Sequence, residues 1–185
     1  MIGQVFNWII EKLPELIATL SGLLYIIYSI DRKVIAWPYG ILSSAIYVYV
    51  FLKAGIFADM AVYVYYVIIG FYGWYNWSKA EDNLNIPVNK TGLKLKWVLS
   101  AITVLLFIGI AFILKNFTTS TIPYWDAFTT ALSITATWML TRRLIEHWLL
   151  WIVVDSVSIG LYLYKGLYPS IILFAVYTIF GHCWL

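Results

Sequence analysis

The chain has 185 residues, of which 63% are hydrophobic and only 11% are charged. Soluble domains carry about 25% charged residues, and a soluble domain of this size could not bury so much apolar surface. The net charge of +3 is spread along the chain and does not indicate nucleic-acid binding. The single cysteine, Cys183, excludes an intrachain disulfide and a cysteine-based metal site. The composition therefore predicts a protein embedded in a lipid bilayer.

Seven apolar stretches follow one another along the chain, each near the roughly 20 residues that a helix needs to cross a membrane. They are 13–30, 34–52, 57–77, 96–114, 122–141, 147–164 and 167–185. Charged residues fall between them, and the segment 78–95 has the Asn, Pro, Gly and mixed charges of a solvated loop. The sequence predicts an all-α membrane protein, with one transmembrane domain over residues 1–185.

The loops differ in their content of Lys and Arg, which predicts the orientation of the chain. Eight basic residues fall on the side that receives the C-terminus and the loops after the first, third and fifth spans, and four fall on the other side. Cytoplasmic loops are enriched in Lys and Arg. We therefore expect the N-terminus outside the cell and the C-terminus inside.

The chain partly matches itself at a spacing of 111 residues. The match pairs Arg32 with Arg143, Trp37 with Trp148, Gly55 with Gly166, and Gly70 with Gly181. Aromatic-rich helices can match by chance, but the shared register of Arg, Trp and two Gly favours a repeat of 13–77 in 122–185, with 78–114 as a connector. Four spans separate the first from the fifth, so the repeats run parallel. Parallel repeats occur in transporters of the SWEET type, in which substrates bind near the membrane midplane.

The stretch HWLLWIVVDSVSIGLYLYKG places a carboxylate, Asp155, near the centre of the expected span 147–164. An acid at that depth costs about 2.5–3.5 kcal/mol on insertion scales, so we expect it to face the bundle interior or a wet cavity. Trp148, Trp151 and Asp155 stand at i, i+3 and i+7 on one helix face. Ser158 continues this face, and His147 lies one turn before Trp151.

A natural ligand for these side chains is a flat, cationic, aromatic molecule. Indole faces attract cations and stack on rings, and each such contact contributes about 0.5–2 kcal/mol when desolvated. The carboxylate adds charge complementarity. Two alternatives stay open: Asp155 hydrogen-bonds across helices and fixes their packing, or it relays protons.

The motif Trp148-Leu-Leu-Trp151-Ile-Val-Val-Asp155 is similar to the pattern of the Pnu family of bacterial vitamin transporters, an aromatic residue followed by W-x-x-x-N/D. The segments PYWDAFTTALSITATWMLTRR, GFYGWYNW and LYKGLY also look like this family. The resemblance covers roughly residues 16 to 185 and is specific enough to indicate the family.

The resemblance implies a SWEET-like 3+1+3 arrangement of seven helices, often assembled as a homotrimer, in the bacterial inner membrane. It implies uptake of a vitamin by facilitated diffusion, followed by trapping by a cytoplasmic kinase. Members that carry nicotinamide riboside usually have Asn at the position of Asp155, and an Asp there resembles the thiamine branch. We therefore expect thiamine as the substrate, then nicotinamide riboside, then riboflavin, which is uncharged and gives little reason to bury a carboxylate.

Further residues are candidates for contact with the substrate. Trp37, the repeat mate of Trp148, completes the aromatic cage or belongs to the interfacial belt, where Trp is common. His147 binds the ligand or, as the favoured alternative, reaches the membrane interface. Tyr63 and Tyr66 donate to substrate hydroxyls or face lipid, and Tyr124 with Trp125 forms a gate.

The sequence lacks the motifs of an enzyme or a metal protein. The two histidines, His147 and His182, do not form H-E-x-x-H, and G-x-S-x-G and the phosphate-binding G-x-x-x-x-G-K-[ST] are absent. We expect no catalytic activity, no metal and no cofactor. A purely structural or receptor protein is the remaining alternative, and it would show no saturable solute flux.

Overall fold

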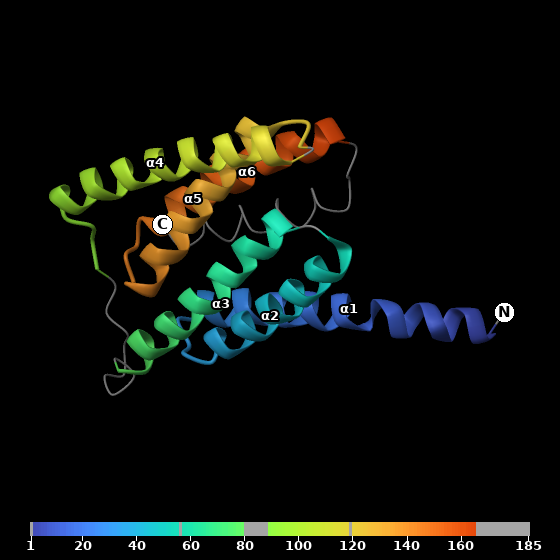
Figure 1. Cartoon of the computed structure of the whole chain (residues 1–185). Helices are drawn as coiled ribbons and strands as arrows, with labels where there is room; N and C mark the ends of the chain where they lie inside the picture. Colours follow the sequence, from blue (N-terminus) through green and yellow to red (C-terminus); the bar gives the residue numbers. More distant parts are fainter. Residues whose placement is uncertain (1, 56, 80–88, 119, 166–185) are drawn as a thin grey trace. The chain divides into compact units, whose positions relative to one another are not determined.

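The structure, a computed structural model, describes residues 2–55, 57–79, 89–118 and 120–165. Six helices fill these ranges: α1 (Ile2–Ile30), α2 (Ala36–Ala54), α3 (Phe57–Ser78), α4 (Leu93–Phe117), α5 (Pro123–Thr141) and α6 (His147–Lys165) (Figure 1). They belong to two compact units, Met1–Ile86 and Pro87–Leu185. The expected seventh span, 167–185, lies outside the described residues.

Each of the first six expected spans coincides with one helix, and most ends agree within three residues. The exception is α1, which begins at Ile2 and runs through Pro14, whereas the sequence predicted a span that starts at residue 13. The agreement arises because charges and turn residues separate the apolar stretches. Gly55, for example, ends α2 in the left-handed conformation with φ 72°, a position at which glycine has no steric cost.

In the first unit, α2 packs against both α1 and α3 (Figure 1). Small and hydroxyl side chains line the contact between α1 and α2. Ala18 is fully buried, and the Ser43 hydroxyl donates a hydrogen bond of 2.7 Å to the Ala18 carbonyl oxygen. Small residues let helix backbones approach closely in membranes, where apolar burial between helices supplies little driving force.

In the second unit, α5 packs against both α4 and α6. Nine of its residues are buried, among them Ala127, Ala131, Thr135, Ala136 and Thr141. Leu99 of α4, Met139 of α5 and Leu144 of the α5–α6 turn form a buried apolar cluster. This cluster fixes the start of α6 against the other two helices of the unit.

The α1–α2 and α5–α6 turns have the same backbone geometry. Arg32 and Arg143 both adopt a left-handed conformation, with φ 55° and 58°, which is uncommon for residues other than glycine. The amide of each arginine donates to the carbonyl three residues earlier, and the amide of the next residue donates to the carbonyl five residues earlier. Trp37 and Trp148 then donate to the carbonyls three residues before them. The residues that match at a spacing of 111 therefore occupy equivalent positions in the two turns.

Large apolar side chains are exposed along the helices, most of all on α4. Leu105 and Phe112 are 69% and 63% exposed, and only Leu99 and Ala111 of α4 are buried. Soluble monomers rarely expose contiguous apolar surface of this extent. By length and composition, two described helices are apolar enough to cross a membrane, Leu13–Ile30 and Leu93–Phe117, and His147–Gly160 is a shorter apolar helix. Tyr and Trp in α2 and α3, and Thr and Ser in α5, lower the apolar character of those helices.

Candidate functional site

The buried face of α6 carries the central carboxylate. Asp155 is 4% exposed, and Val154 and Ser158 on either side of it are also buried. Trp151, one turn earlier, is half-buried, as is Trp148. Within the described part of the chain, no hydrogen bond or ion pair reaches the Asp155 carboxylate. The expectation that this acid faces the interior is confirmed.

The α5–α6 turn sets the position of the Trp148–Asp155 face. His147 begins α6; its amide donates to the Leu144 carbonyl at 3.2 Å, and its ring Nδ1 lies 2.7 Å from the same oxygen. The His147 ring also lies against the Trp148 indole, with 4.8 Å between ring centroids. His147 is only 6% exposed, so the favoured expectation that its ring reaches the interface is wrong. The short distance to a carbonyl indicates that Nδ1 carries the proton, which orients the ring and holds Trp148 beside it.

Trp37 occupies the core of the first unit rather than an interfacial belt. It is 2% exposed, with Trp77 and Tyr25 edge-on to its ring at centroid distances of 5.4 and 6.2 Å. A Cβ atom built on Gly73 would overlap its six-membered ring, so glycine is needed at this close approach. The Trp37 Nε1–H is buried and finds no acceptor in the part of the chain that the structure describes. That Trp37 joins Trp148 and Trp151 in one cage remains a prediction.

Tyr63 and Tyr66 belong to an aromatic cluster in the first unit. Tyr63 lies 5.0 Å from Tyr47, 5.3 Å from Phe51 and 5.6 Å from Tyr66 between ring centroids. The Tyr47 hydroxyl shares a hydrogen bond of 3.1 Å with Thr19 of α1. These contacts give both tyrosines packing partners within α2 and α3, and substrate contact by either remains a prediction.

The two gate candidates lie in the first turn of α5. Tyr124 and Trp125 are 54% and 53% exposed. The Lys115 ammonium lies 5.9 Å from the Tyr124 ring centroid, and Trp125 packs edge-on to Phe128 at 6.3 Å. Asp126 accepts a hydrogen bond of 2.6 Å from Ser120, as expected for an acid in the first turn of a helix. The gating role of both residues remains a prediction.

Sequence reasoning missed a polar contact that joins the loop before α4 to the start of α6. The Glu146 carboxylate accepts hydrogen bonds from the Thr91 amide at 3.0 Å and the Thr91 hydroxyl at 2.7 Å. The Lys96 Nζ lies 3.3 Å from the Glu146 Oε1 and forms an ion pair with it. Asn89 pairs with the turn as well, because its amide donates to Arg143 and its carbonyl accepts from Ile145. We call these contacts the Glu146 clamp. A separation of 55 residues hides it from local sequence patterns.

The Glu146 clamp makes the stability of the chain depend on pH. Partial burial opposes ionisation of Glu146, but the Thr91 hydrogen bonds and Lys96 outweigh it and lower the pKa of this carboxyl from 4.5 to about 2. A lowered folded-state pKa contributes stability above pH 4.5 that is lost as the pH falls toward 2.

We expect Glu146→Gln to lower the free energy of unfolding at pH 7 by about 1–3 kcal/mol, because a partly buried charged acceptor is removed. Thermal unfolding in detergent at pH 7 and pH 3 measures this, and the wild-type advantage should shrink at pH 3. Asp31→Asn is the control, since its ion pair with Lys33 is exposed and such pairs contribute little. An advantage that does not change with pH would contradict the role of the charge.

Buried hydroxyl groups on α5 were also missed. Ser133, Thr135, Thr137 and Thr141 are each at most 7% exposed. Thr135 donates to the Ala131 carbonyl and shares a 2.7 Å hydrogen bond with Thr103 of α4. The signal in the sequence is the run TALSITATWMLT, in which small and hydroxyl residues replace large apolar ones. Among the described residues, no group of three or more His, Cys, Asp or Glu is placed to hold a metal.

Comparison with known proteins gives consistent matches over nearly the whole chain. The family model described as nicotinamide mononucleotide transporter matches residues 12–183. The nicotinamide riboside transporter PnuC of Escherichia coli (strain K12) is 22% identical, over 95% of this chain and 82% of that protein. The riboflavin/roseoflavin transporter RibM of Streptomyces davaonensis is 22% identical, over 88% of this chain and 78% of that protein. The crystal structure of the vitamin B3 transporter PnuC has the same fold, with a TM-score of 0.74, 21% identity, and coverage of 98% of this chain and 84% of that one.

Proposed function

The chain belongs to the nicotinamide mononucleotide transporter family, and we propose that it carries thiamine across the bacterial plasma membrane. It is a vitamin transporter of this family, and its relatives are transporters rather than enzymes. The observation that carries the substrate assignment is the burial of Asp155, which is 4% exposed in the centre of α6.

A buried carboxylate is expensive unless a positive charge or hydrogen-bond donors neutralise it. Within the described residues no such partner contacts Asp155. A cationic substrate supplies the missing charge, and the half-buried indoles of Trp148 and Trp151 on the same helix supply faces on which a flat ring stacks. In this proposal Asp155 pairs with the thiazolium or the aminopyrimidine of thiamine, and Ser158 donates a further hydrogen bond.

Nicotinamide riboside is the second candidate, because a relative that aligns with most of the chain is named as a nicotinamide riboside transporter. Its pyridinium is also a cation that Asp155 would stabilise. An asparagine recognises the carboxamide of nicotinamide through one donor and one acceptor, whereas a carboxylate can only accept. The aspartate in this chain therefore favours thiamine. Riboflavin, named for one relative, has no positive charge and ranks third.

The transport mechanism that we propose is facilitated diffusion, followed by phosphorylation of the vitamin by a cytoplasmic kinase. The sequence contains no phosphate-binding G-x-x-x-x-G-K-[ST] motif that would couple transport to ATP. Seven helices in a parallel 3+1+3 repeat, with the N-terminus outside and assembly as a trimer, complete the proposal. Support for the repeat comes from the α1–α2 and α5–α6 turns, whose hydrogen bonds are the same at a spacing of 111 residues.

Uptake of labelled thiamine into liposomes that contain the purified chain tests the proposal. We expect saturable uptake that, in liposomes without a membrane potential, stops at equal inside and outside concentrations and needs no ion gradient. A thiamine pyrophosphokinase enclosed with ATP inside the liposomes should phosphorylate the imported thiamine. Because the product does not return through the transporter, uptake should then continue further. Preference for nicotinamide riboside in competition would reassign the substrate, and absence of flux of any of the three vitamins would refute the transport proposal.

A further inference from the structure

One end of the second unit gathers five basic side chains around a single acid. Lys90 lies in the loop before α4, Lys94 and Lys96 lie in its first turn, and Arg142 and Arg143 lie in the α5–α6 turn. The Glu146 clamp brings these two segments together, since Asn89 and Thr91 on either side of Lys90 bond to the turn. We call the five residues the basic cluster. The cluster is built by the fold, because about 50 residues separate its two parts.

Within the described part of the second unit, one of these five basic residues, Lys96, forms an ion pair with an acid. Glu146 is the one acid in 89–97 and 142–147, and it is already bonded to Thr91 and Lys96. Within the described part of the chain no ion pair holds Lys90 or Lys94, and both are exposed. The Nε and Nη1 atoms of Arg143 are buried and have no acceptor among the described residues. The basic cluster therefore has spare donors and excess positive charge.

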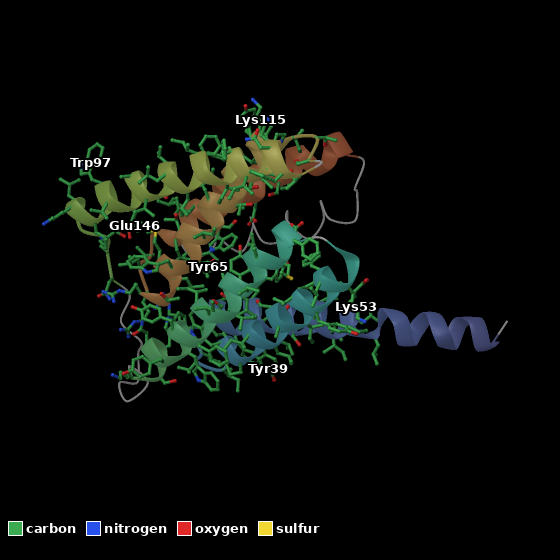
Figure 2. All side chains as sticks on the ribbon, in the orientation of Figure 1. Tyr39, Lys53, Tyr65, Trp97, Lys115 and Glu146 are labelled. Atoms are coloured by element: carbon green, nitrogen blue, oxygen red, sulfur yellow. The ribbon has the colours of Figure 1, made fainter. Side chains whose placement is uncertain are left out.

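An apolar stripe on α4 begins at the basic cluster. Leu93 and Trp97 are 74% and 72% exposed beside Lys94, and Leu105, Ile108 and Phe112 continue the exposed side at helical spacing. Tryptophan is enriched where a membrane helix passes the headgroup region. Figure 2 shows Trp97 and Glu146 near one end of α4, with Lys115 near the other. Charge and apolar surface are thus arranged in the order of a phospholipid, headgroup first and acyl chains next.

We propose that the basic cluster and the α4 stripe bind an anionic phospholipid. The headgroup phosphate accepts hydrogen bonds from the exposed Lys90 and Lys94, the partly buried Arg143 guanidinium adds positive charge beneath them, and the acyl chains lie along Leu105, Ile108 and Phe112. Basic pockets beside membrane helices bind anionic headgroups through this combination of charge and apolar contact. The lipid binds at one end of the second unit, so this inference does not depend on which vitamin the chain carries.

Titration of phosphatidylglycerol into the full chain in a zwitterionic detergent tests the proposal, with binding followed by microscale thermophoresis. The variant K90Q/K94Q is expected to weaken binding by about 10- to 30-fold, because each basic residue contributes to the attraction of an anionic headgroup. The matched control is K53Q/K115Q, which removes two exposed lysines from the last turns of α2 and α4. R143Q tests the guanidinium separately, and it should weaken binding less than the double variant.

Other ligands distinguish lipid binding from its alternatives. Phosphatidylcholine should bind weakly, and inorganic phosphate should not displace phosphatidylglycerol. Equal weakening by K90Q/K94Q and K53Q/K115Q would overturn the proposal in favour of general electrostatic attraction. Displacement by inorganic phosphate would overturn it in favour of a free-anion site. A change of oligomeric state in K90Q/K94Q with unchanged lipid affinity would show instead that a second copy of the chain covers this surface.

Discussion

Asp155→Asn is expected to weaken thiamine binding by about 10- to 100-fold, which corresponds to about 1.4–2.7 kcal/mol. Asp155 is 4% exposed, and in the low dielectric of a buried site its attraction to a thiazolium is poorly screened. Removal of one partner from a buried charge pair costs about 2–5 kcal/mol, and the oxygen that Asn retains reduces this loss. Isothermal titration calorimetry with the purified chain measures the change in dissociation constant.

The same variant tests the choice between the two cationic vitamins. Asn at this position offers a donor and an acceptor to a carboxamide, so we expect nicotinamide riboside to lose less affinity than thiamine, or to gain it. The control is Asp31→Asn, which makes the same chemical change at an exposed ion pair and should leave both affinities unchanged. Unchanged thiamine binding together with a lower unfolding temperature would show that Asp155 fixes helix packing and does not contact the substrate.

The sequence predicts the positions of the helices and the burial of the central acid well. Both depend on the free-energy cost of placing a charged group in the membrane, which can be read from the local sequence. Apolar stretches end where charges fall, and the six described helices occupy six of the expected spans. Asp155 was expected to be buried because lipid exposure of a mid-span carboxylate is costly. The match of Arg32 with Arg143 at a spacing of 111 residues also predicted that the two arginines occupy equivalent positions, and both adopt the same left-handed conformation.

The sequence could not predict which side of an aromatic helix is buried. Helices α2 and α3 are apolar all round, so Trp37 and Trp77 gave no contrast between a lipid face and a core face. The burial of Trp37 depends instead on Gly73, whose missing side chain makes room for the Trp37 ring, and Trp77 packs edge-on to that ring. The Glu146 clamp was missed for a different reason, because it joins the loop before α4 to a turn that lies far along the chain.

Gly73→Ala is expected to destabilise the chain by about 1–3 kcal/mol, the range measured for overpacking of a core. The added methyl would overlap the six-membered ring of Trp37, and that ring cannot move away easily because Trp77 lies edge-on at 5.4 Å. Thermal unfolding of the purified chain in detergent measures the loss. Gly109→Ala is the matched control: a Cβ there meets nothing within 4 Å, and Ala favours a helix over Gly. The control should be neutral or stabilising.

Trp37→Phe provides the test of mechanism, because phenylalanine lacks the part of the indole that Gly73 contacts. Alone, this change leaves a cavity, but it also removes a buried Nε1–H that has no acceptor among the described residues, so the two effects partly offset each other. In the Trp37→Phe background, Gly73→Ala should cost much less than in the wild type, and a double-mutant cycle gives the coupling. Additive losses would show that glycine at position 73 serves another purpose than accommodating this ring. Coupled losses would establish that Trp37 is a fixed core residue of the first unit, which constrains how far its indole can turn toward a substrate.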